Sequence, residues 1–585
     1  MRNSVIIQVI LITCAYVHGK TNDEWNLQIL HNSDMHSRFE QTRSTSSKCF
    51  PYYTSKQGKC YGGFARIATL VRKAKNSTIP TLFLNAGDTY QGTVYYTVHK
   101  WRIVSKFLNL LKPDAISLGN HEFDDGPEGL VPFINAAEFP IVTSNLDLTG
   151  EPELAAATKL SNSTVITVDG RRVGIIGYLT PETKVISSPG KVVFLDEVET
   201  VRREVNKLQA DNVTIIIALG HSGFGADKKI AAEVDGVDLV IGGHTNTFLY
   251  SGRKPDLEVP EGLYPTEVIQ KNGRKVYVVQ AYAYTKYLGN LSVTFDAAGE
   301  IRSINGNPIL VTSDIEQAPD ILHELEAWRP TDELLTKTPL GFTKVFLDGD
   351  KKRCRSRECN FGNLITEAMV DYNAKQYLTG FGWTDASIAI VNSGIIRKSI
   401  NKALDTPITM KDVLESLPFY NAIVKVKMTG NDIFEMLEHS VNALVCKKIC
   451  PITGRFLQFS GLTVIYNISQ PYGHRVVRDS VFVLCSNCRT PIYEVIDPNK
   501  TYTILTTDYL LNGGDGYKML KNLTWTNTGV TTDQILANYL INKSPIYPII
   551  DNKIMFFVND HNNSISKNMY NFTLITLSVL IILYY

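Results

Sequence analysis

The chain has 585 residues, a formal net charge of +1 at pH 7, and 44% hydrophobic and 20% charged residues. Two domains are expected at this length, because one hydrophobic core rarely extends beyond about 250–300 residues. The balanced charge and the lack of an extended basic tract argue against a nucleic-acid partner, and the ordinary apolar content argues against a disordered chain.

The first 19 residues are typical of a secretory signal peptide. Arg2 supplies the positive charge, residues 5–15 form an apolar core, and residues 17–19 form a small-x-small cleavage site. We therefore expect the mature protein to begin near Lys20, in an oxidising compartment. Several N-x-[ST] sequons agree with secretion.

Cysteine spacing predicts local disulfides. Cys14 lies in the signal core, and the other eight cysteines of the chain fall into sequential pairs that each close a short loop. The pairs are Cys49 with Cys60, Cys354 with Cys359, Cys446 with Cys450, and Cys485 with Cys488. The last pair forms a C-x-x-C motif that could be redox-active in a cytosolic chain, but a secreted protein favours a structural bridge.

Polar side chains that can bind metals follow five apolar runs in the first half of the chain. The runs cover residues 27–30, 81–84, 115–118, 214–219 and 237–241. The polar residues after them are, in the same order, Asp34 with His36, Asp88, Asn120, His221, and His244 with Asn246. Helical stretches such as 64–73 and 200–208 alternate with these runs, which indicates a layered α/β domain. Ligands bind outside the carboxyl ends of strands in such sheets, so we expect these side chains to converge on one crevice.

Residues 119–124 (GNHEFD) are the densest of these clusters. Burying an amide, an imidazole and carboxylates together is costly unless a cation or a reaction centre lies among them. On a turn, His121 could point into the substrate space, and Asp124 is near enough to orient its ring. Imidazole and carboxylate ligands match zinc, while carboxylate and amide oxygens also tolerate manganese or magnesium.

The series D-x-H, G-D, G-N-H-E-x-D, G-H and G-G-H resembles the calcineurin-like metallophosphoesterases, and its order and spacing are similar to the 5′-nucleotidase and apyrase branch. The resemblance implies two divalent ions, which we expect to be zinc, with Asp88 bridging them. It assigns Asp34, His36 and Asn246 to one ion, and Asn120, His221 and His244 to the other. It also implies that His121 and Asp124 stabilise the transition state while a metal-activated water attacks phosphorus in line.

A connecting helix is predicted near residue 320. Ile321, Leu325 and Trp328 recur at helical spacing between Pro319 and Pro330. The expected segments are a signal peptide at 1–19, a metallophosphoesterase domain at 20–312, a linker helix at 313–336, a second domain at 337–557 and a tail at 558–585. The linker helix is the predicted hinge.

Four later motifs resemble the second domain of 5′-nucleotidases: residues 354–359 (CRSREC), 392–397 (NSGIIR), 417–419 (LPF) and 508–517 (DYLLNGGDGY). Carried over by position, the resemblance implies that Phe419 and Tyr509 sandwich the purine, Asp515 accepts from the ribose hydroxyls, Asn392 meets the base, and Arg355 and Arg397 bind the phosphate end. The chain departs from the family pattern at Asp508, at Tyr509, where phenylalanine is common, and at Ser393 and Ile395, where glycine is usual. Tyrosine keeps an aromatic face for stacking.

An amphipathic helix is predicted over residues 431–444, with His439 on it. His439 has no ligand-type neighbours in the sequence, so we expect it to be structural.

The C-terminal tail predicts a lipid anchor. A polar stretch after Phe557 leads to the apolar residues 574–585, which end the chain. This run is shorter than the roughly 20 residues of a spanning helix. It fits a glycosylphosphatidylinositol (GPI) signal with attachment at Asn562, and a tail-anchored or secreted form is the alternative.

Together these features predict a two-domain α/β protein. Its first domain is a four-layer-type metallophosphoesterase domain, and a linker helix joins it to an α/β nucleotide-binding domain. The expected function is that of an extracellular, GPI-anchored 5′-nucleotidase that hydrolyses AMP. The alternatives are an apyrase acting on ATP and ADP, and a nucleotide-binding surface protein without catalysis. The resemblance further implies a homodimer through the second domain.

Overall fold

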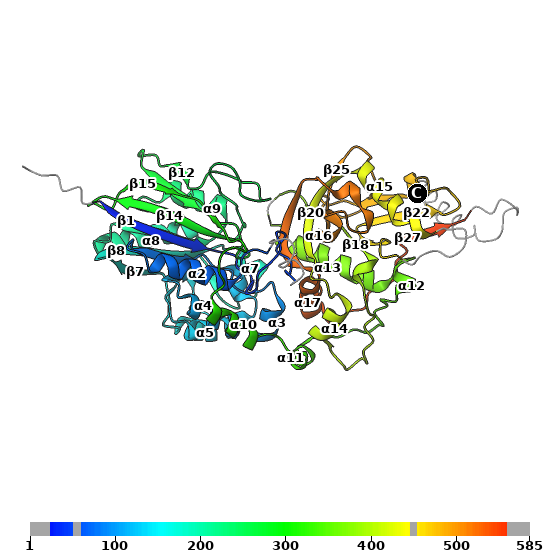
Figure 1. Cartoon of the computed structure of the whole chain (residues 1–585), viewed down its shortest axis with the longest axis horizontal. Coiled ribbons are helices and arrows are strands. Elements are labelled where there is room, and N and C mark those ends of the chain that lie inside the picture. Colours follow the sequence, from blue (N-terminus) through cyan, green and yellow to red (C-terminus); the bar gives the residue numbers. More distant parts are fainter. Residues whose placement is uncertain (1–23, 51–59, 379, 445–452, 559–585) are drawn as a thin grey trace, which may run out of the picture.

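The computed structural model describes residues 24–50, 60–378, 380–444 and 453–558. They form two lobes that lie side by side along the long axis (Figure 1): the first lobe extends to residue 328 and the second lobe starts at residue 332. The predicted signal peptide, the tail with Asn562, and the Cys446–Cys450 pair lie outside the described residues. Among the described helices, none is long and apolar enough to cross a membrane.

The first lobe contains two mixed sheets. One has the strand order β15 (Ile301–Gly306), β14 (Tyr287–Phe295), β1 (Trp25–Asn32), β2 (Thr81–Asn85), β3 (Ala115–Ser117), β4 (Ile141–Val142) and β6 (Leu160–Ser161), with β16 (Ile309–Leu310) paired to β14. The other has the order β12 (Thr266–Ile269), β13 (Lys275–Val279), β11 (Leu239–Ile241), β10 (Ile215–His221), β8 (Arg171–Leu179) and β7 (Ser163–Val168). Strands β1, β2, β3 and β4 run parallel, as do β8, β10, β11 and β13.

Alternation of side chains along these strands builds four layers. Leu27 and Ile29 of β1 pack between the two sheets, whereas Leu30 faces the helices outside the first sheet. Those helices are α2 (Phe64–Lys75), α3 (Val94–His99), α4 (Trp101–Leu111), α5 (Gly126–Ala136) and α10 (Pro319–Ala327). Helices α8 (Glu197–Ala210) and α9 (Phe224–Glu233) cover the second sheet. The expected α/β four-layer architecture is thus present, because both faces of each sheet are apolar.

The second lobe is also α/β. Its larger sheet has the order β21 (Leu457–Ser460), β18 (Ile388–Asn392), β25 (Thr501–Thr507), β20 (Ala422–Thr429) and β26 (Trp525–Thr531). Helices α13 (Asn360–Gln376), α14 (Met410–Ser416) and α17 (Thr532–Lys543) pack on one face. Helix α15 (Gly430–Ser440) packs on the other, together with a sheet of β24 (Tyr493–Val495), β23 (Phe482–Leu484), β22 (Leu462–Asn467) and β27 (Ile554–Phe557).

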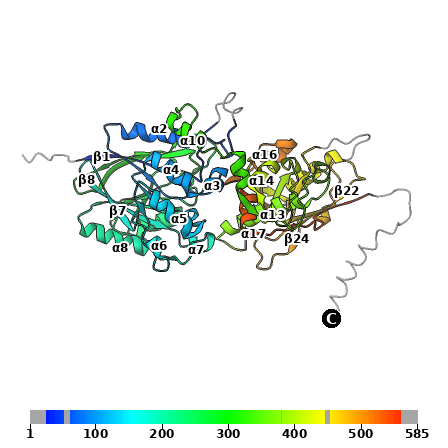
Figure 2. The same cartoon turned by 90° about the horizontal axis from the view of Figure 1, so that it is seen from below.

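The predicted connecting helix exists as α10, but it docks on the first lobe. Ile321 and Leu325 are buried in the first-lobe core, Asp320 pairs with Arg72 of α2, and Figure 2 shows α10 beside α2. The next helix, α11 (Asp332–Lys337), packs on α14 of the second lobe. The chain therefore crosses between the lobes at residues 329–331, after the helix that was the predicted hinge.

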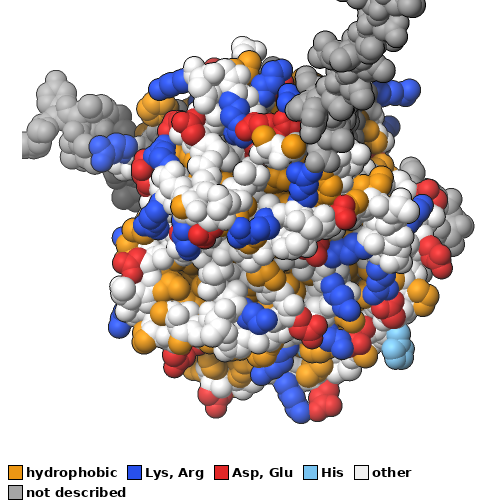
Figure 3. Space-filling model, turned by 90° about the vertical axis from the view of Figure 1, so that its left-hand side faces the viewer, with side chains coloured by type: hydrophobic (Ala, Val, Ile, Leu, Met, Phe, Trp, Pro, Cys, Tyr) orange, Lys and Arg blue, Asp and Glu red, His pale blue; other side chains and the backbone are white. Residues whose placement is uncertain are grey.

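Disulfides link Cys49 to Cys60, Cys354 to Cys359 and Cys485 to Cys488. On the end of the molecule shown in Figure 3, cationic and anionic side chains are interspersed, which matches a net charge near zero.

Candidate active site

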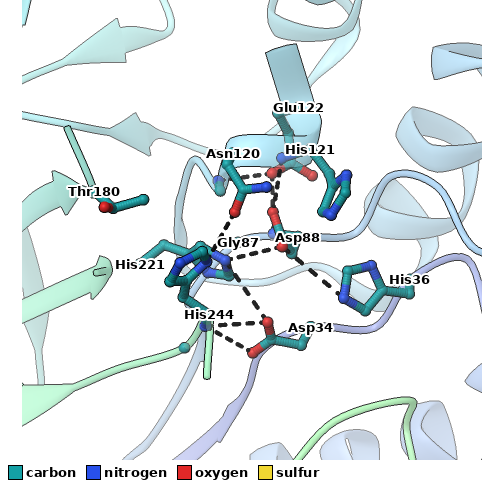
Figure 4. A network of polar contacts seen from close by, with 12 residues as sticks. Asp34, His36, Gly87, Asp88, Asn120, His121, Glu122, Thr180, His221 and His244 are labelled. Atoms are coloured by element: carbon teal, nitrogen blue, oxygen red, sulfur yellow. Dashed lines mark hydrogen bonds and ion pairs between the residues drawn. The ribbon is translucent and has the colours of Figure 1, made fainter. Parts of the chain in front are cut away.

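The metal-binding candidates come together where the carboxyl ends of the two sheets of the first lobe meet (Figure 4). The segments that carry them follow β1, β2, β3 and β11, and His221 is the last residue of β10. The turn after β3 is a short 3₁₀ helix, Asn120–Phe123, which carries both Asn120 and His121. Parallel strands present their carboxyl ends at one edge of a sheet, so the sequence pattern and the topology agree here.

Asp88 lies at the centre of the cluster, with His36 and His221 on opposite sides (Figure 4). His221 Nε2 is 2.9 Å and His36 Nε2 is 3.9 Å from Asp88 Oδ2, and the backbone N–H of His121 donates to Asp88 Oδ1 at 3.0 Å. The ligand atoms of Asp88, His221 and His244 lie within 4.8 Å of one another, as do those of Asp88, His36 and His121. Asp88 belongs to both groups.

Asp34 and Asn120 complete this cluster from opposite sides of His244. The backbone N–H of His244 donates to Asp34 Oδ1 at 3.1 Å, and its Nδ1 lies 2.9 Å from Asn120 Oδ1. Asp34 Oδ1 is 3.7 Å from His221 Nε2. Asn246 lies further out, where its Nδ2 donates to the Tyr284 hydroxyl at 2.9 Å.

The side chains present fit divalent metal ions. Among the described residues, the buried atoms His221 Nε2 and Asn246 Oδ1 have no partner in hydrogen-bonding geometry, although His221 Nε2 lies beside Asp88. Both atoms belong to side chains that can bind metals, and a bound ion would give each of them a partner.

Burial and the neighbouring carboxylates together set the protonation of the imidazoles. It lowers the pKa of His36 and of His244 to about 3, which keeps both rings in the neutral form that binds metals. For His221, burial acts in the same direction, but Asp88 and Asp34 outweigh it and raise the pKa to about 9. Burial raises the pKa of Asp34 to about 7; His221 opposes this shift and Asp88 adds to it. A cation beside these two carboxyl groups favours their charged forms.

Several of these residues have strained backbones. Asp34, His36, Asp88, His244 and Asn246 all have positive φ angles, from 44° for His36 to 79° for His244. A left-handed conformation of a residue other than glycine costs about 1–3 kcal/mol and persists only where the surroundings hold it, which occurs most often at functional sites.

Glu122 is a functional residue that the sequence analysis did not single out. It is buried, and its carboxylate accepts hydrogen bonds from the backbone N–H groups of Gly119, Asp88, Thr89 and Tyr90, at 2.7–3.1 Å. Glu122 thus ties the loop after β2 to the turn after β3 and holds Asp88 in place. The sequence feature that could have pointed to Glu122 is its position inside the GNHEFD stretch.

His121 and Asp124 form a pair at the edge of the cluster. His121 Nδ1 lies 2.7 Å from Asp124 Oδ2, and Ser187 Oγ donates to Asp124 Oδ1 at 2.7 Å. Burial lowers the pKa of His121, but Asp124 and Asp88 outweigh this effect and raise it to about 10. Since Nδ1 is committed to Asp124, Nε2 remains to act on a ligand in the cavity that His121 lines.

The six candidates for nucleoside and phosphate recognition also come together, in the second lobe. Asp515 accepts from Asn392 Nδ2 at 2.7 Å and from the Tyr509 hydroxyl at 2.9 Å. The Arg397 guanidinium lies 5.5 Å from the centre of the Phe419 ring.

The sixth residue, Arg355, is close enough to Arg397 and Asp515 for their charges to shift its pKa. Burial lowers its pKa, Arg397 lowers it further, and Asp515 opposes both effects. Phe419 and Tyr509 are 43% and 41% exposed, so both rings are available for stacking.

The two clusters do not face the same space. A cavity of about 890 Å³ separates the lobes at the metal cluster, and its far wall includes Tyr372, Tyr377, Lys425 and Asn527 of the second lobe. None of the six nucleoside-recognition candidates belongs to its lining. In this arrangement, a small substrate at the metal-binding cluster would face the second-lobe residues of the cavity wall, and not the nucleoside-recognition candidates.

Comparisons with known proteins match both lobes. Residues 27–248 match the calcineurin-like phosphoesterases, and residues 339–522 match the 5′-nucleotidase C-terminal domain. The chain is 42% identical to Protein 5NUC of Lutzomyia longipalpis, covering 94% of this chain and 95% of that one. It is also 42% identical to the 5′-nucleotidase of Bos taurus, covering 96% and 95%. Among solved structures, a 5′-nucleotidase precursor from Thermus thermophilus has 34% identity and a TM-score of 0.53, covering 92% of this chain and all of its own.

Proposed function

We propose that this chain, which belongs to the 5′-nucleotidase family and is a phosphoric monoester hydrolase, releases phosphate from nucleoside 5′-monophosphates, with AMP as its main substrate. The observation that supports this proposal most directly is the pair of clusters described above. One cluster gathers metal-binding side chains around Asp88. The other has two exposed aromatic rings, with Tyr509 beside Asp515 and Phe419 beside Arg397. The first suits a phosphate ester and the second suits a nucleoside.

Two divalent ions held by the Asp88 cluster, which we infer to be zinc, would activate a water molecule and neutralise the phosphoryl oxygens. Asp34, His36 and Asn246 are the proposed ligands of one ion. Asn120, His221 and His244 are the proposed ligands of the other, with Asp88 shared.

His121 and the two residues that support it, Asp124 and Ser187, have the remaining roles. From Nε2, His121 donates a hydrogen bond to the phosphoryl group or to the leaving oxygen. Asp124 accepts a hydrogen bond from Nδ1–H and so fixes the direction of the ring, and Ser187 donates a hydrogen bond to Asp124.

The direct test is phosphate release from AMP, ADP and ATP, measured side by side with added zinc and with a chelator. We expect AMP to be the best substrate and the chelator to abolish turnover. Faster release from ADP and ATP would support the apyrase alternative, and a lack of release from all three with intact nucleotide binding would support a non-catalytic protein.

We expect His121→Ala to retain its metal ions and to lose about 10²–10⁴-fold in kcat, because it removes a donor that acts on the transition state. Metal content and kcat would be measured on the same preparation. Asp124→Asn is the companion variant, since it keeps the shape but weakens the hold on Nδ1, and its loss should be smaller. Loss of metal from His121→Ala would instead make His121 a ligand.

We expect the double variant Phe419→Ala with Tyr509→Ala to raise KM for AMP strongly, since stacking contributes about 1–3 kcal/mol per base. Hydrolysis of an aryl phosphate, which has no base to stack, should change little. Equal loss of both activities, with metal content intact, would show that these rings do not act through the base.

We further propose that the protein is extracellular and GPI-anchored at Asn562. Phosphatidylinositol-specific phospholipase C should then release active enzyme from cells. Retention in the membrane pellet, while a known GPI-anchored control protein is released, would contradict this anchor.

We also infer a homodimer through the second domain, with the domains at 20–312 and 337–557. Sedimentation of the soluble enzyme should give twice the chain mass, and a monomer at micromolar concentration would contradict it.

A further inference from the structure

The loop that carries Asp515 is held in a strained conformation. Asp515 has φ 49° and ψ 18°, in the left-handed region, and it lies between Gly513 with φ 80° and Gly516 with φ 88°. Glycine adopts such angles freely, but aspartate does so at a cost and needs contacts that hold it there. These contacts decide where the Asp515 carboxylate points.

His439 of α15 makes one of these contacts. Its Nε2 lies 2.9 Å from the backbone oxygen of Asp515, 76 residues away in the sequence. A carbonyl oxygen only accepts, so Nε2 carries the proton and donates it. From the sequence, His439 is expected to be purely structural, because no ligand-type residue neighbours it along the chain. The structure places it beside a residue of the nucleoside-recognition cluster.

The His439 ring is itself fixed by packing. It meets the ring of Tyr517 edge-on, with 4.7 Å between centroids, and Tyr517 is fully buried. The Tyr517 hydroxyl donates to the backbone oxygen of Arg455 at 2.5 Å. His439 therefore offers its donor from a fixed direction, as a positioning group must.

The side chain of Asp515 is held at its other end by the nucleoside-recognition cluster. Its two oxygens accept from Asn392 and Tyr509, and its backbone N–H donates to the Tyr509 hydroxyl at 3.1 Å. The bond from His439 holds the carbonyl side of the same residue. With the carbonyl, the amide and the carboxylate all held, the carboxylate is fixed in place beside the exposed Tyr509 side chain.

We propose that His439 is a positioning residue for substrate recognition: by holding the Asp515 carbonyl it directs the Asp515 carboxylate at the 2′- and 3′-hydroxyls of the ribose. This inference rests on the proposed function. His439, which does not touch the substrate, would thus contribute to the discrimination between ribose and sugars that lack the 2′- and 3′-hydroxyls.

The test compares three variants that differ in where they offer a hydrogen-bond donor. His439→Gln places its amide nitrogen near the position of Nε2, His439→Asn places it near Nδ1, and His439→Ala removes it. The first readout is calorimetric binding of adenosine and of 2′,3′-dideoxyadenosine to the full metal-loaded enzyme. We expect His439→Ala and His439→Asn to weaken adenosine binding about 3- to 10-fold, the effect of one net hydrogen bond. We expect dideoxyadenosine binding to be unchanged and His439→Gln to bind adenosine like the wild type.

The second readout is kinetic. KM for AMP should rise by the same factor in the Ala and Asn variants, while kcat and the hydrolysis of an aryl phosphate stay the same. Equal weakening for adenosine and dideoxyadenosine, or no recovery in His439→Gln, would reduce His439 to a structural residue and overturn the inference.

The measurements on the wild-type enzyme distinguish a failure of the proposed function from a failure of the proposed role of His439. A wild-type enzyme that binds no adenosine contradicts both of them. A wild-type enzyme that binds adenosine and releases phosphate from AMP, with variants that do not discriminate between the sugars, contradicts only the role of His439.

Discussion

Replacing Asp88 with asparagine should abolish phosphate release and lower the number of metal ions bound per chain. Asparagine keeps the size of the side chain and an oxygen that accepts from the His121 N–H, but it removes the charge shared by both groups of candidate ligands. Asp88 is buried, and His221 and His121 hold its pKa well below its usual range although burial opposes them. We expect a loss of more than about 10³-fold, beyond the effect of removing a single hydrogen-bond donor from a transition state.

The measurement pairs metal content by mass spectrometry with phosphate release, and Asp238→Asn is the matched control. Asp238 is another buried aspartate of the same lobe, but it precedes β11 and pairs with Arg274, at the end of the strand away from the cluster. The control should keep its metal ions and its turnover even if it is less stable. Full activity in Asp88→Asn would overturn the shared-ligand assignment.

The positions of the metal-binding candidates could be predicted because two simple patterns coincide. An apolar run of four to six residues predicts a buried strand, and parallel strands place the residues after them at one edge. His221 and Asp88 come within 2.9 Å for this reason, although 133 positions separate them. A short spacing between two cysteines likewise predicts a disulfide between them, because each has few other cysteines nearby in the chain.

Other features could not be predicted because they depend on long-range packing. The spacing of Ile321 and Leu325 predicts a helix with one apolar face, but not which lobe buries that face. Two further features leave no periodic signal in the sequence: the hydrogen bonds that Glu122 accepts from backbone N–H groups after β2, and the positive φ angles of the ligand loops. The contact of His439 with Asp515 likewise arises only when α15 and the Gly-rich loop are placed together.

The distance between the metal-binding cluster and the nucleoside-recognition cluster also depends on long-range packing, here of one lobe against the other. This separation leads to the second prediction with a large expected effect. Several contacts hold the lobes in the present arrangement: Arg38 donates to the backbone oxygen of Gly529, Thr97 donates to Gln534, and Asp508, the residue before Tyr509, accepts from the first lobe. Asp508 Oδ2 accepts from Thr45 Oγ1 at 2.8 Å and from Ser47 Oγ at 3.1 Å, both from the first lobe. A nucleotide that touches both clusters requires these contacts to open.

A crosslink at this contact should therefore stop AMP hydrolysis without touching the chemistry. In the double variant Thr45→Cys with Asp508→Cys, one sulfur would take the place of Thr45 Oγ1 and the other that of the carboxyl carbon of Asp508, whose oxygen contacts Thr45 across the lobes. We expect oxidation to reduce AMP hydrolysis by at least about 10²-fold, because a misplaced substrate loses its alignment with the reacting groups. Aryl phosphate hydrolysis should persist, since the cavity of about 890 Å³ still leads to the metal cluster.

The two single-cysteine variants and the wild type, treated with the same oxidant and mild reductant, control for changes at the native disulfides, and mass spectrometry confirms the crosslink. Recovery of AMP hydrolysis on reduction would assign the loss to the locked arrangement rather than to the substitutions. If the crosslinked enzyme instead hydrolyses AMP as fast as the reduced one, nucleotides are cleaved from the arrangement described above. The base would then have to bind the far wall of the cavity, near Tyr372 and Tyr377, and the cluster around Asp515 would have to serve another purpose.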